Sequence, residues 1–265
     1  EQGISYTEFT YMLLQAYDFM HLYDHEGCTI QLGGSDQWGN ILSGRELIRR
    51  RLGGRAEGIT FPLLMTSSGK KFGKSEAGAI WLDAELTSPY QLYQYWLQSA
   101  DADVIRYLKL FTFLSQEEIE TLAQETKRAP EQREAQRCLA AANTKIIHGA
   151  DAVRAVETVS RILFSGSKER PDRRVIDMLA AELPSATIER AALAEGVKVG
   201  ALLSMTGLAK SNKAARQLLQ GGGVSINNER LSVEQQQLTE IPGGWEGALL
   251  LQVGKKRHAL IQVSE

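Results

Sequence analysis

Hydrophobic residues recur along this chain at spacings that change from segment to segment, and each spacing predicts an element. Residues 9–20 repeat their apolar positions at helical intervals, whereas residues 28–32 form a short β-prone run that ends in Gly33-Gly34. Residues 40–51 return to an amphipathic helical pattern, and residues 59–65 favour another strand. Strand, glycine turn and helix in this order predict one βα unit of an open α/β sheet.

The next part of the chain has a helical pattern throughout. Apolar spacing after residue 88 predicts a long helical stretch that includes helices over 104–113, 117–125, 132–147 and 150–163. This region is therefore expected to be an all-α domain. Residues 168–194 are charged, mixed in pattern and interrupted by two prolines, which indicates a linker with a short helix.

Short elements return toward the C-terminus. Residues 199–203 and 211–220 favour helices, and the second of these begins with a serine suited to capping it. The glycines at 221–223 then lead into a hairpin whose turn is Asn227-Asn228. This pattern predicts a small α+β domain.

These patterns divide an α/β protein into four regions. One and a half βα units cannot form a stable doubly wound sheet, so residues 1–84 are expected to be the second half of a nucleotide-binding domain. Residues 85–166 are expected to form the α-helical domain, residues 167–197 the linker, and residues 198–265 the small C-terminal domain.

Composition excludes several classes of protein. With 43% hydrophobic and 23% charged residues the chain is an ordinary globular one. No apolar run reaches the roughly 18 residues of a membrane span, and no signal peptide opens the chain, so a cytoplasmic location is expected. Cys28 and Cys138 lack the spacing of metal ligands and the four histidines form no HExxH-like pattern. Free thiols and no protein-bound transition metal are expected.

The sharpest chemistry lies in residues 69–75, where Lys71 and Lys74 stand three apart on a glycine-broken loop. Two such lysines can reach a polyphosphate, while the Gly33-Gly34 turn can hold a ribose. A P-loop is excluded because that motif needs four residues between its glycines, whereas this loop has three. A P-loop also opens a helix, which the following residues do not favour. The pattern indicates a nucleotide site of another kind.

Four segments in a fixed order give the chain a family resemblance. They are residues 11–18 (YMLLQAYD), 31–40 (QLGGSDQWGN), 71–75 (KFGKS) and the C-terminal segment from residue 199. KFGKS resembles the KMSKS signature loop of class I aminoacyl-tRNA synthetases in its tyrosyl form, and the C-terminal segment resembles the S4 RNA-binding fold. The whole chain is similar to bacterial tyrosyl-tRNA synthetases. The HIGH-like motif in the first half of that family's nucleotide fold has no counterpart here, so the resemblance is to the C-terminal portion.

Three polar residues of the first helix carry the expected amino-acid site. Tyr11, Gln15 and Asp18 stand at i, i+4 and i+7 and share one helix face, which spacing alone leaves as a solvated polar face. The resemblance implies that Tyr11 and Gln15 hold the α-ammonium group of tyrosine and that Asp18 accepts a hydrogen bond from its phenol. It also implies that Gln37 lies beside the tyrosine carboxylate and the α-phosphate. Phenylalanine would leave a buried acceptor at Asp18 unpaired.

The resemblance also implies an ATP site. The backbone of Gly34 and the carboxylate of Asp36 would meet the ribose hydroxyls, where a plain turn is the alternative interpretation. Lys71 and Lys74 would stabilise the charge that grows on the departing pyrophosphate, and Ser75 would bond a phosphate oxygen or cap the loop. A solvated basic loop is the simpler alternative for the lysines.

The C-terminal region is basic although the chain has a net charge of -2, because residues 198–265 carry eight Lys or Arg against five Glu. Lys210, Lys213 and Arg216 stand at i, i+3 and i+6 on one helix face. A solvated face accounts for that spacing equally well. The S4 resemblance implies contact with transfer-RNA phosphates, which releases counterions.

The resemblance implies a reaction and its partners. Tyrosine would be activated by ATP, accompanied by Mg²⁺, to tyrosyl-adenylate and transferred to tRNA(Tyr). The complete enzyme would be a homodimer with no membrane or DNA partner, and this piece alone is expected to be inactive. Two alternatives stay open: a non-catalytic S4-type RNA-binding protein with a decayed nucleotide fold, and a tryptophan-type class I synthetase. The intact motif residues argue against decay, while Asp18 and the C-terminal segment favour tyrosine.

Overall fold

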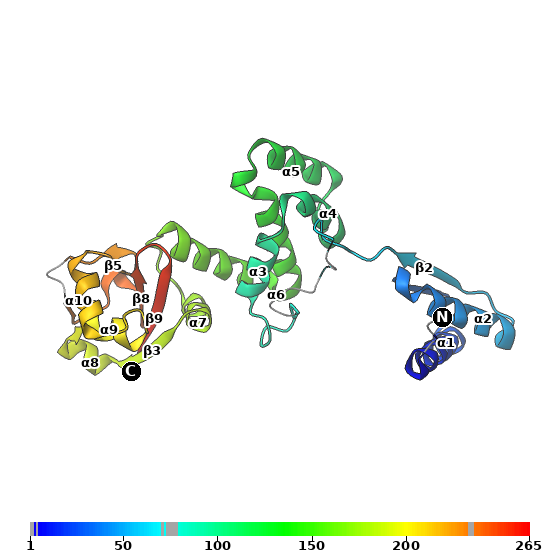
Figure 1. Ribbon diagram of the computed structural model, residues 1–265, viewed down its shortest axis with the longest axis horizontal. Helices are drawn as coiled ribbons and strands as arrows, with labels where there is room; N and C mark the ends of the chain where they lie inside the picture. The colour runs from blue at the N-terminus through cyan, green and yellow to red at the C-terminus, as the bar shows by residue number, and fades with distance from the viewer. Residues whose placement is uncertain (1–2, 4, 70–71, 73–78, 233–235) are drawn as a thin grey trace. The chain divides into compact units, whose positions relative to one another are not determined.

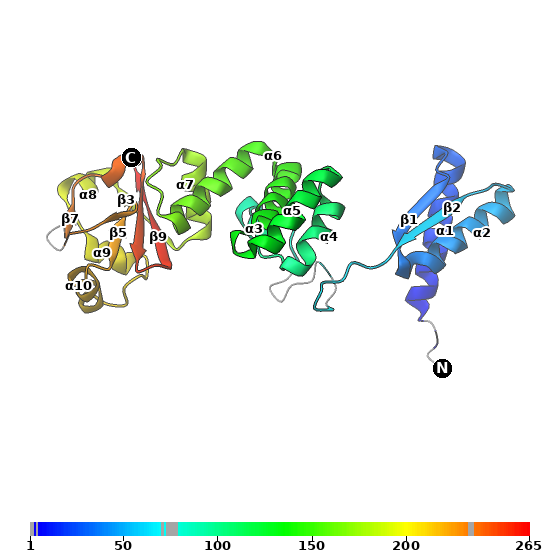
Figure 2. The ribbon, with the colours of Figure 1, turned by 90° about the horizontal axis from the view of Figure 1, so that it is seen from above.

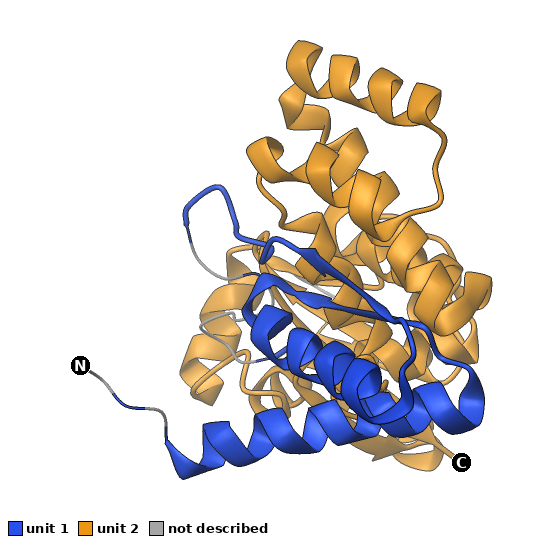
Figure 3. Cartoon of the chain, turned by 90° about the vertical axis from the view of Figure 1, so that its right-hand side faces the viewer, with its two compact units in different colours: residues 1–79 blue, residues 80–265 orange. Residues whose placement is uncertain are grey.

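The computed structural model (Figure 1) describes residues 3, 5–69, 72, 79–232 and 236–265. The chain folds into two compact units, residues 1–79 and residues 80–265 (Figure 3). Three residues of the sequence-predicted nucleotide site, Lys71, Lys74 and Ser75, lie outside the described residues. Their assignments remain sequence-based proposals.

The first unit contains the predicted βα unit (Figure 2). Its elements are α1 (Tyr6–Glu26), β1 (Ile30–Gly34), the 3-10 turn η1 (Ser35–Gln37), α2 (Trp38–Leu52) and β2 (Glu57–Phe61). β1 and β2 pair in parallel with Leu32 opposite Ile59, so α2 is the crossover between them. Helix α1 packs on α2, and Phe19, Ile48 and Ala56 are buried together.

Local chemistry explains where α1 begins and ends. Ser5 and Glu8 form a reciprocal capping box in which the Ser5 side chain accepts from Glu8 N, while Glu8 accepts from Ser5 N at 2.9 Å. Gly27 ends the helix in the left-handed conformation. Between these ends Ala16 and Phe19 are buried, and Phe19 lies so close to α2 that a Cβ on Gly44 would stand 2.9 Å from its ring. Glycine at position 44 therefore permits the α1–α2 contact.

Within the first unit, one face of the small sheet is covered by no element that the structure describes. Ile30, Leu32, Ile59 and Phe61 alternate with residues that face α2, and their exposed fractions are 50, 60, 45 and 56%. Parallel strands normally carry cover on both faces, which is why their apolar residues are usually buried. Here only the α2 side is covered by residues that the structure describes.

The second unit begins with a helical domain, residues 89–165. It contains α3 (Pro89–Leu97), α4 (Asp101–Phe111), α5 (Gln116–Arg128), the turn η2 (Pro130–Gln132) and α6 (Glu134–Ser165). Trp96, Tyr107 and Phe111 pack ring against ring at centroid distances of 5.1 to 6.2 Å. α6 is interrupted at Gly149, which has φ 84 and ψ 170, so the predicted boundary between two helices falls where the backbone leaves helical geometry.

The rest of the second unit contains a five-stranded sheet and several short helices. Its elements are α7 (Arg173–Glu182), β3 (Ser185–Glu189), α8 (Arg190–Glu195), β4 (Val197–Lys198), α9 (Val199–Met205), α10 (Asn212–Gln220), β5 (Val224–Ile226), β6 (Glu229–Arg230), β7 (Gln237–Leu238), η3 (Pro242–Gly244), β8 (Ala248–Val253) and β9 (Arg257–Ser264). The strand order is β3-β9-β8-β5-β6, with β4 and β7 paired separately. The hairpin predicted around Asn227-Asn228 is present as β5 and β6.

The stretch expected to be a linker, residues 167–197, is largely folded. β3 pairs in parallel with β9, placing Ser185 opposite Leu260, and Ile188 and Leu193 are buried in the same core as α9, α10 and the sheet. We therefore use the name C-terminal domain for residues 185–265. α7 precedes it and packs on α6.

Candidate functional site

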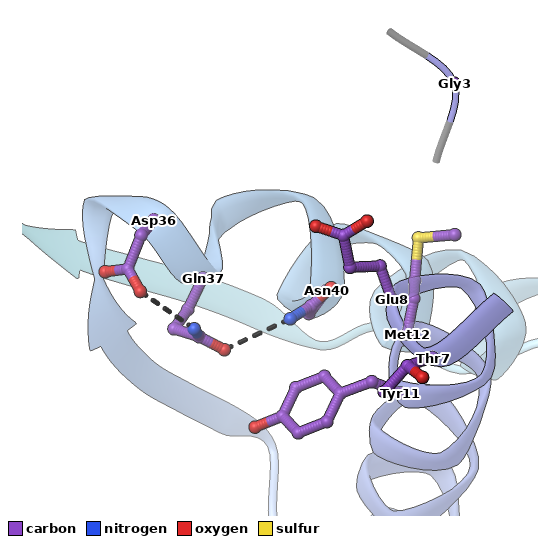
Figure 4. A pocket seen from close by; sticks show the side chains of 8 residues that line it. All are labelled: Gly3, Thr7, Glu8, Tyr11, Met12, Asp36, Gln37 and Asn40. Carbon is purple, nitrogen blue, oxygen red and sulfur yellow. Dashed lines mark hydrogen bonds between the residues drawn. The ribbon is translucent and has the colours of Figure 1, made fainter. Parts of the chain in front are cut away.

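The first unit has an open pocket of about 660 Å³ between α1 and the start of α2 (Figure 4). Three residues of the sequence-predicted site line it: Tyr11 from α1, and Asp36 and Gln37 from η1. The Tyr11 ring projects from α1 toward the space beside Gln37 (Figure 4). The α1 and η1 segments, which only the family resemblance assigned to one site, thus lie around the same pocket.

The polar side of the pocket is a chain of hydrogen bonds. Asn40 Nδ2 donates to Gln37 Oε1 at 3.1 Å, and Gln37 Nε2 donates to Asp36 Oδ2 at 2.9 Å. These amide contacts hold the Asp36 carboxylate at the end of β1, the edge where open α/β sheets bind ligands. The exposed Asp36 can therefore accept hydrogen bonds from hydroxyl groups.

Gly34 lies directly against this carboxylate. A Cβ added to Gly34 would stand 2.4 Å from Asp36 Oδ1, so the carboxylate would have to move to make room for it. The backbone of Gly34 is extended, with φ -69 and ψ 160, so glycine is needed here for space and not for conformation. The β1 turn thereby exposes both a peptide backbone and a carboxylate.

Only part of the α1 face that is predicted to bind an amino acid lies at the pocket. Tyr11 is 55% exposed and lines it, while Gln15 and Asp18 follow on the same face of the helix. Gln15 is half-buried, its Nε2 donates to Gln31 Oε1 at 3.4 Å, and its own Oε1 is buried without a partner among the described residues. Asp18 is exposed and does not line the pocket.

Sequence reasoning missed several lining residues, namely Gly3, Thr7, Glu8, Met12 and Asn40. Asn40 could have been found, because it stands one helical turn after Gln37 and carries an amide suited to orienting it. Glu8 is part of the capping box of α1. Hydrogen bonds from the Ser5 backbone and side chain hold the pKa of its carboxyl below the usual value.

The predicted RNA-binding residues lie at helix α10 of the C-terminal domain. Lys210, Lys213 and Arg216 are all exposed, whereas Ala215 and Leu219 of the same helix are buried. Ser211 caps the helix by accepting from Ala214 N at 3.2 Å. Lys213 and Arg216 therefore lie on the exposed side of a helix whose opposite side is buried in the core. Lys210 precedes the helix, two residues before its first residue.

Among the described residues, no group of three His, Cys, Asp or Glu side chains is arranged to hold a metal ion. No helix in the same part of the chain has both the length and the apolar character needed to cross a membrane.

Comparison with known proteins gives two family matches. Residues 1–165 match the family described as tRNA synthetases class I (W and Y). Residues 176–261 match the C-terminal domain of the kind described as tyrosine–tRNA ligase SYY-like. The first match covers the pocket residues. The second covers Lys210, Lys213 and Arg216, which we call the α10 surface.

Similar individual proteins carry related names. The chain is 48% identical over 264 residues to a tyrosine–tRNA ligase of Bacillus caldotenax, covering 99% of this chain and 62% of that protein. It is 49% identical over 266 residues to a tyrosine–tRNA ligase of Anaeromyxobacter dehalogenans, of which it covers 63%. A truncated mitochondrial tyrosyl-tRNA synthetase of Coccidioides posadasii is a structural neighbour with a TM-score of 0.50 and 38% identity, over 59% of this chain and 45% of that one. The chain thus spans less than two thirds of the length of these relatives.

Proposed function

Because the chain belongs to the class I tRNA synthetase family of the tryptophan and tyrosine enzymes, we propose that it is part of a tyrosine–tRNA ligase. The full-length enzyme activates tyrosine with ATP to tyrosyl-adenylate and transfers the tyrosyl group to tRNA(Tyr). The observation that carries the proposal is the pocket at which Tyr11 of α1 meets the Asp36-Gln37 pair of η1. The tyrosine–tRNA ligase names of the relatives support the choice of amino acid.

Residues that line the pocket, and residues further along the same face of α1, fit separate parts of the two substrates. Tyr11 and Gln15 bind the α-ammonium group of tyrosine, and the unpaired Gln15 Oε1 is an acceptor suited to that cation. Asp18 accepts a hydrogen bond from the phenol O–H of tyrosine. The indole N–H of tryptophan does not lie in the position of that hydroxyl. Gln37 lies beside the tyrosine carboxylate, oriented by its contacts with Asp36 and Asn40.

ATP binds next to the amino acid. The Gly34 backbone and the Asp36 carboxylate meet the ribose hydroxyls, and the space that glycine leaves at position 34 allows the close approach. The tyrosine carboxylate then attacks the α-phosphate and pyrophosphate leaves, so no protein nucleophile is required. Lys71 and Lys74 stabilise the charge on the leaving group and Ser75 bonds a phosphate oxygen. Mg²⁺ accompanies the nucleotide as part of the substrate, held mainly by phosphate oxygens and water.

The remaining partners follow from the other regions. The α10 cations Lys210, Lys213 and Arg216 contact tRNA phosphates. Additional residues, which make up more than a third of the relatives' length, complete the nucleotide fold and cover the bare sheet face at Leu32 and Phe61. We also propose that the full-length enzyme is a homodimer in the cytoplasm.

Amino-acid-dependent exchange of pyrophosphate into ATP tests this function. The full-length enzyme should exchange with tyrosine and give only background with tryptophan or phenylalanine. Asp18→Asn should weaken tyrosine selectivity while the protein remains folded by circular dichroism. Exchange that depends on tryptophan would identify the other enzyme of the family. No exchange with any amino acid, with RNA binding retained, would identify a non-catalytic RNA-binding protein.

A further inference from the structure

The last turn of α6 receives a hydrogen-bond donor from the C-terminal domain. Gly166 ends α6 in the left-handed conformation with φ 64, and its N–H donates to Arg161 O. The last four carbonyls of any helix lack donors within the helix. For Ile162 O the donor is Asn228, which lies 66 positions further along the chain.

Asn228 uses both N–H bonds of its side-chain amide in this contact. Its Nδ2 donates to Ile162 O at 2.9 Å and to Ser167 O at 2.7 Å, which accounts for both N–H bonds of the amide. Both carbonyls belong to the end of α6 and the residues just after it. A donor at this position also complements the negative end of the helix dipole.

The turn itself does not require the Asn228 side chain. Asn227 and Asn228 have φ 50 and 61, so both are left-handed, and they join β5 to β6 as a two-residue hairpin turn. Glycine satisfies such a backbone at least as well. Asn227 is fixed within the C-terminal domain, since its side chain donates to Pro242 O and accepts from Leu250 N. The Asn228 amide instead points at α6.

Neighbouring residues strengthen the same junction. Lys168 Nζ lies 3.3 Å from Glu229 Oε1, next to the turn. The Arg170 guanidinium packs on Gly244 so closely that a Cβ there would stand 2.6 Å from Nη2. The ion pair is exposed and contributes little. Of the polar contacts between the hairpin and this junction, the two hydrogen bonds of Asn228 are the directional ones. Helix α7 contacts both α6 and β9 and restrains the same junction.

We propose that Asn228 is a positioning residue that fixes the orientation of the C-terminal domain on the end of α6. It thereby holds Lys210, Lys213 and Arg216 at a set place relative to the helical domain. An RNA that contacts both domains then meets a preorganised surface and loses less ordering entropy on binding. This consequence for RNA rests on the proposed function, whereas the orientation itself does not.

Distance measurements between spin labels test the orientation without any RNA. Labels at Glu120→Cys in α5 and Glu189→Cys in β3, with Cys28 and Cys138 replaced by serine, report on the two domains. The unchanged junction should give one narrow distance distribution. Asn228→Gly, which keeps the turn but removes the amide, should broaden it at least twofold. Asn228→Asp, which places an acceptor against two carbonyls, should broaden it further, and Lys168→Ala should leave it narrow.

An equally narrow distribution in Asn228→Gly and Asn228→Asp would overturn the proposal. Trp245 is buried in the C-terminal domain. The difference in near-ultraviolet circular dichroism between each variant and its Trp245→Phe form therefore shows whether that domain stays folded. If Asn228→Asp unfolds the domain, the Asn228→Gly distribution decides alone, since glycine suits the turn.

The full-length enzyme then tests the consequence for RNA. Asn228→Gly should raise the KM for tRNA(Tyr) about fivefold or more and leave tyrosine-dependent pyrophosphate exchange unchanged. A broadened distance distribution with an unchanged KM would show that orientation does not matter for RNA and would overturn that part. If the unsubstituted enzyme binds no tRNA, the proposed function fails while the distance result still stands.

Discussion

The Asp36 carboxylate lies against the backbone of Gly34, where a single methyl group would stand 2.4 Å from Oδ1. Asp36 is held there by Gln37 Nε2 at 2.9 Å. Since Gly34 is extended, with φ -69, an added Cβ strains no backbone torsion and displaces only the carboxylate. Substitution of Gly34 therefore tests a role in nucleotide binding separately from a role in folding.

Gly34→Ala should impair nucleotide use without unfolding the protein. We expect the KM for ATP of the full-length enzyme to rise roughly tenfold or more, the scale of one hydrogen bond to a charged group. The free energy of unfolding should change by only about 0.5 kcal/mol. Gly39→Ala is the matched control, because Gly39 lies in α2 with open space around it. An unchanged KM for ATP in Gly34→Ala would remove Asp36 from the ribose site.

His258 should make the C-terminal domain less stable in mild acid. It is buried in β9 with Nε2 unpaired among the described residues, and burial lowers its pKa from the usual 6.5. The unfolded chain therefore takes up a proton at a pH where the folded protein does not, so stability is full above about pH 6.5 and falls as the pH drops below it. Urea midpoints at pH 7.5 and 5.5 measure this difference.

His258→Leu should reduce that pH dependence. The change removes the titrating group and leaves an apolar side chain in a buried place. Burial also lowers the pKa of His148 in α6. Part of the pH dependence of stability should therefore remain in His258→Leu. A matched His148→Leu variant isolates that remainder. Identical pH dependence in His258→Leu and the unsubstituted protein would show that His258 is not linked to folding.

The sequence could predict much of the local structure and less of the long-range pairing. The βα unit was predictable because an apolar run, a glycine pair and an amphipathic helix follow one another directly from residue 28 to 51. The end of one helix and the start of the next near Gly149 were also visible in the apolar spacing. Such features depend on neighbours a few residues apart.

Contacts between distant segments left no such signal. Ser185 pairs with Leu260, and neither residue's local sequence pattern indicates which strand it pairs with. The pattern of residues 168–194 therefore predicts only a linker with a short helix. The contact of Asn228 with Ile162 was equally hidden, since Asn-Asn predicts a turn and says nothing of what its side chain meets. In the pocket, Asp36 and Gln37 follow from a motif. The helical spacing of Asn40 from Gln37 allows a contact between them, and the observed hydrogen bond establishes it.

The lysine loop should act on the transition state more than on tyrosine binding. In the full-length enzyme, Lys71→Ala or Lys74→Ala should slow tyrosyl-adenylate formation by about 100-fold or more, equal to about 2.7 kcal/mol. Tyrosine affinity should barely change, because the proposed tyrosine contacts are Tyr11, Gln15 and Asp18 on α1. Single-turnover kinetics with equilibrium binding separate the two quantities. A tenfold weaker tyrosine affinity with an intact rate would make the loop a structural support.

The α10 surface should bind RNA mainly through charge. Replacing Lys210, Lys213 and Arg216 by alanine together should weaken tRNA binding and lower the slope of log affinity against log salt by up to about 0.9 per lost phosphate contact. Lys210→Arg, Lys213→Arg and Arg216→Lys combined keep the charge and should keep most of the slope. Tyrosine activation without tRNA should be unchanged in both. An unaltered slope in the alanine variant would leave the three residues as a solvated face.

The most direct test of the account is whether this chain becomes a ligase when its nucleotide fold is completed. The chain alone should give only background tyrosine-dependent pyrophosphate exchange. Joined to the part of the Bacillus caldotenax ligase that it does not match, it should exchange well above background, and Lys74→Ala in the same fusion should abolish most of that gain. Exchange by the chain alone, or a folded fusion that exchanges no better than its Lys74→Ala form, would contradict the account.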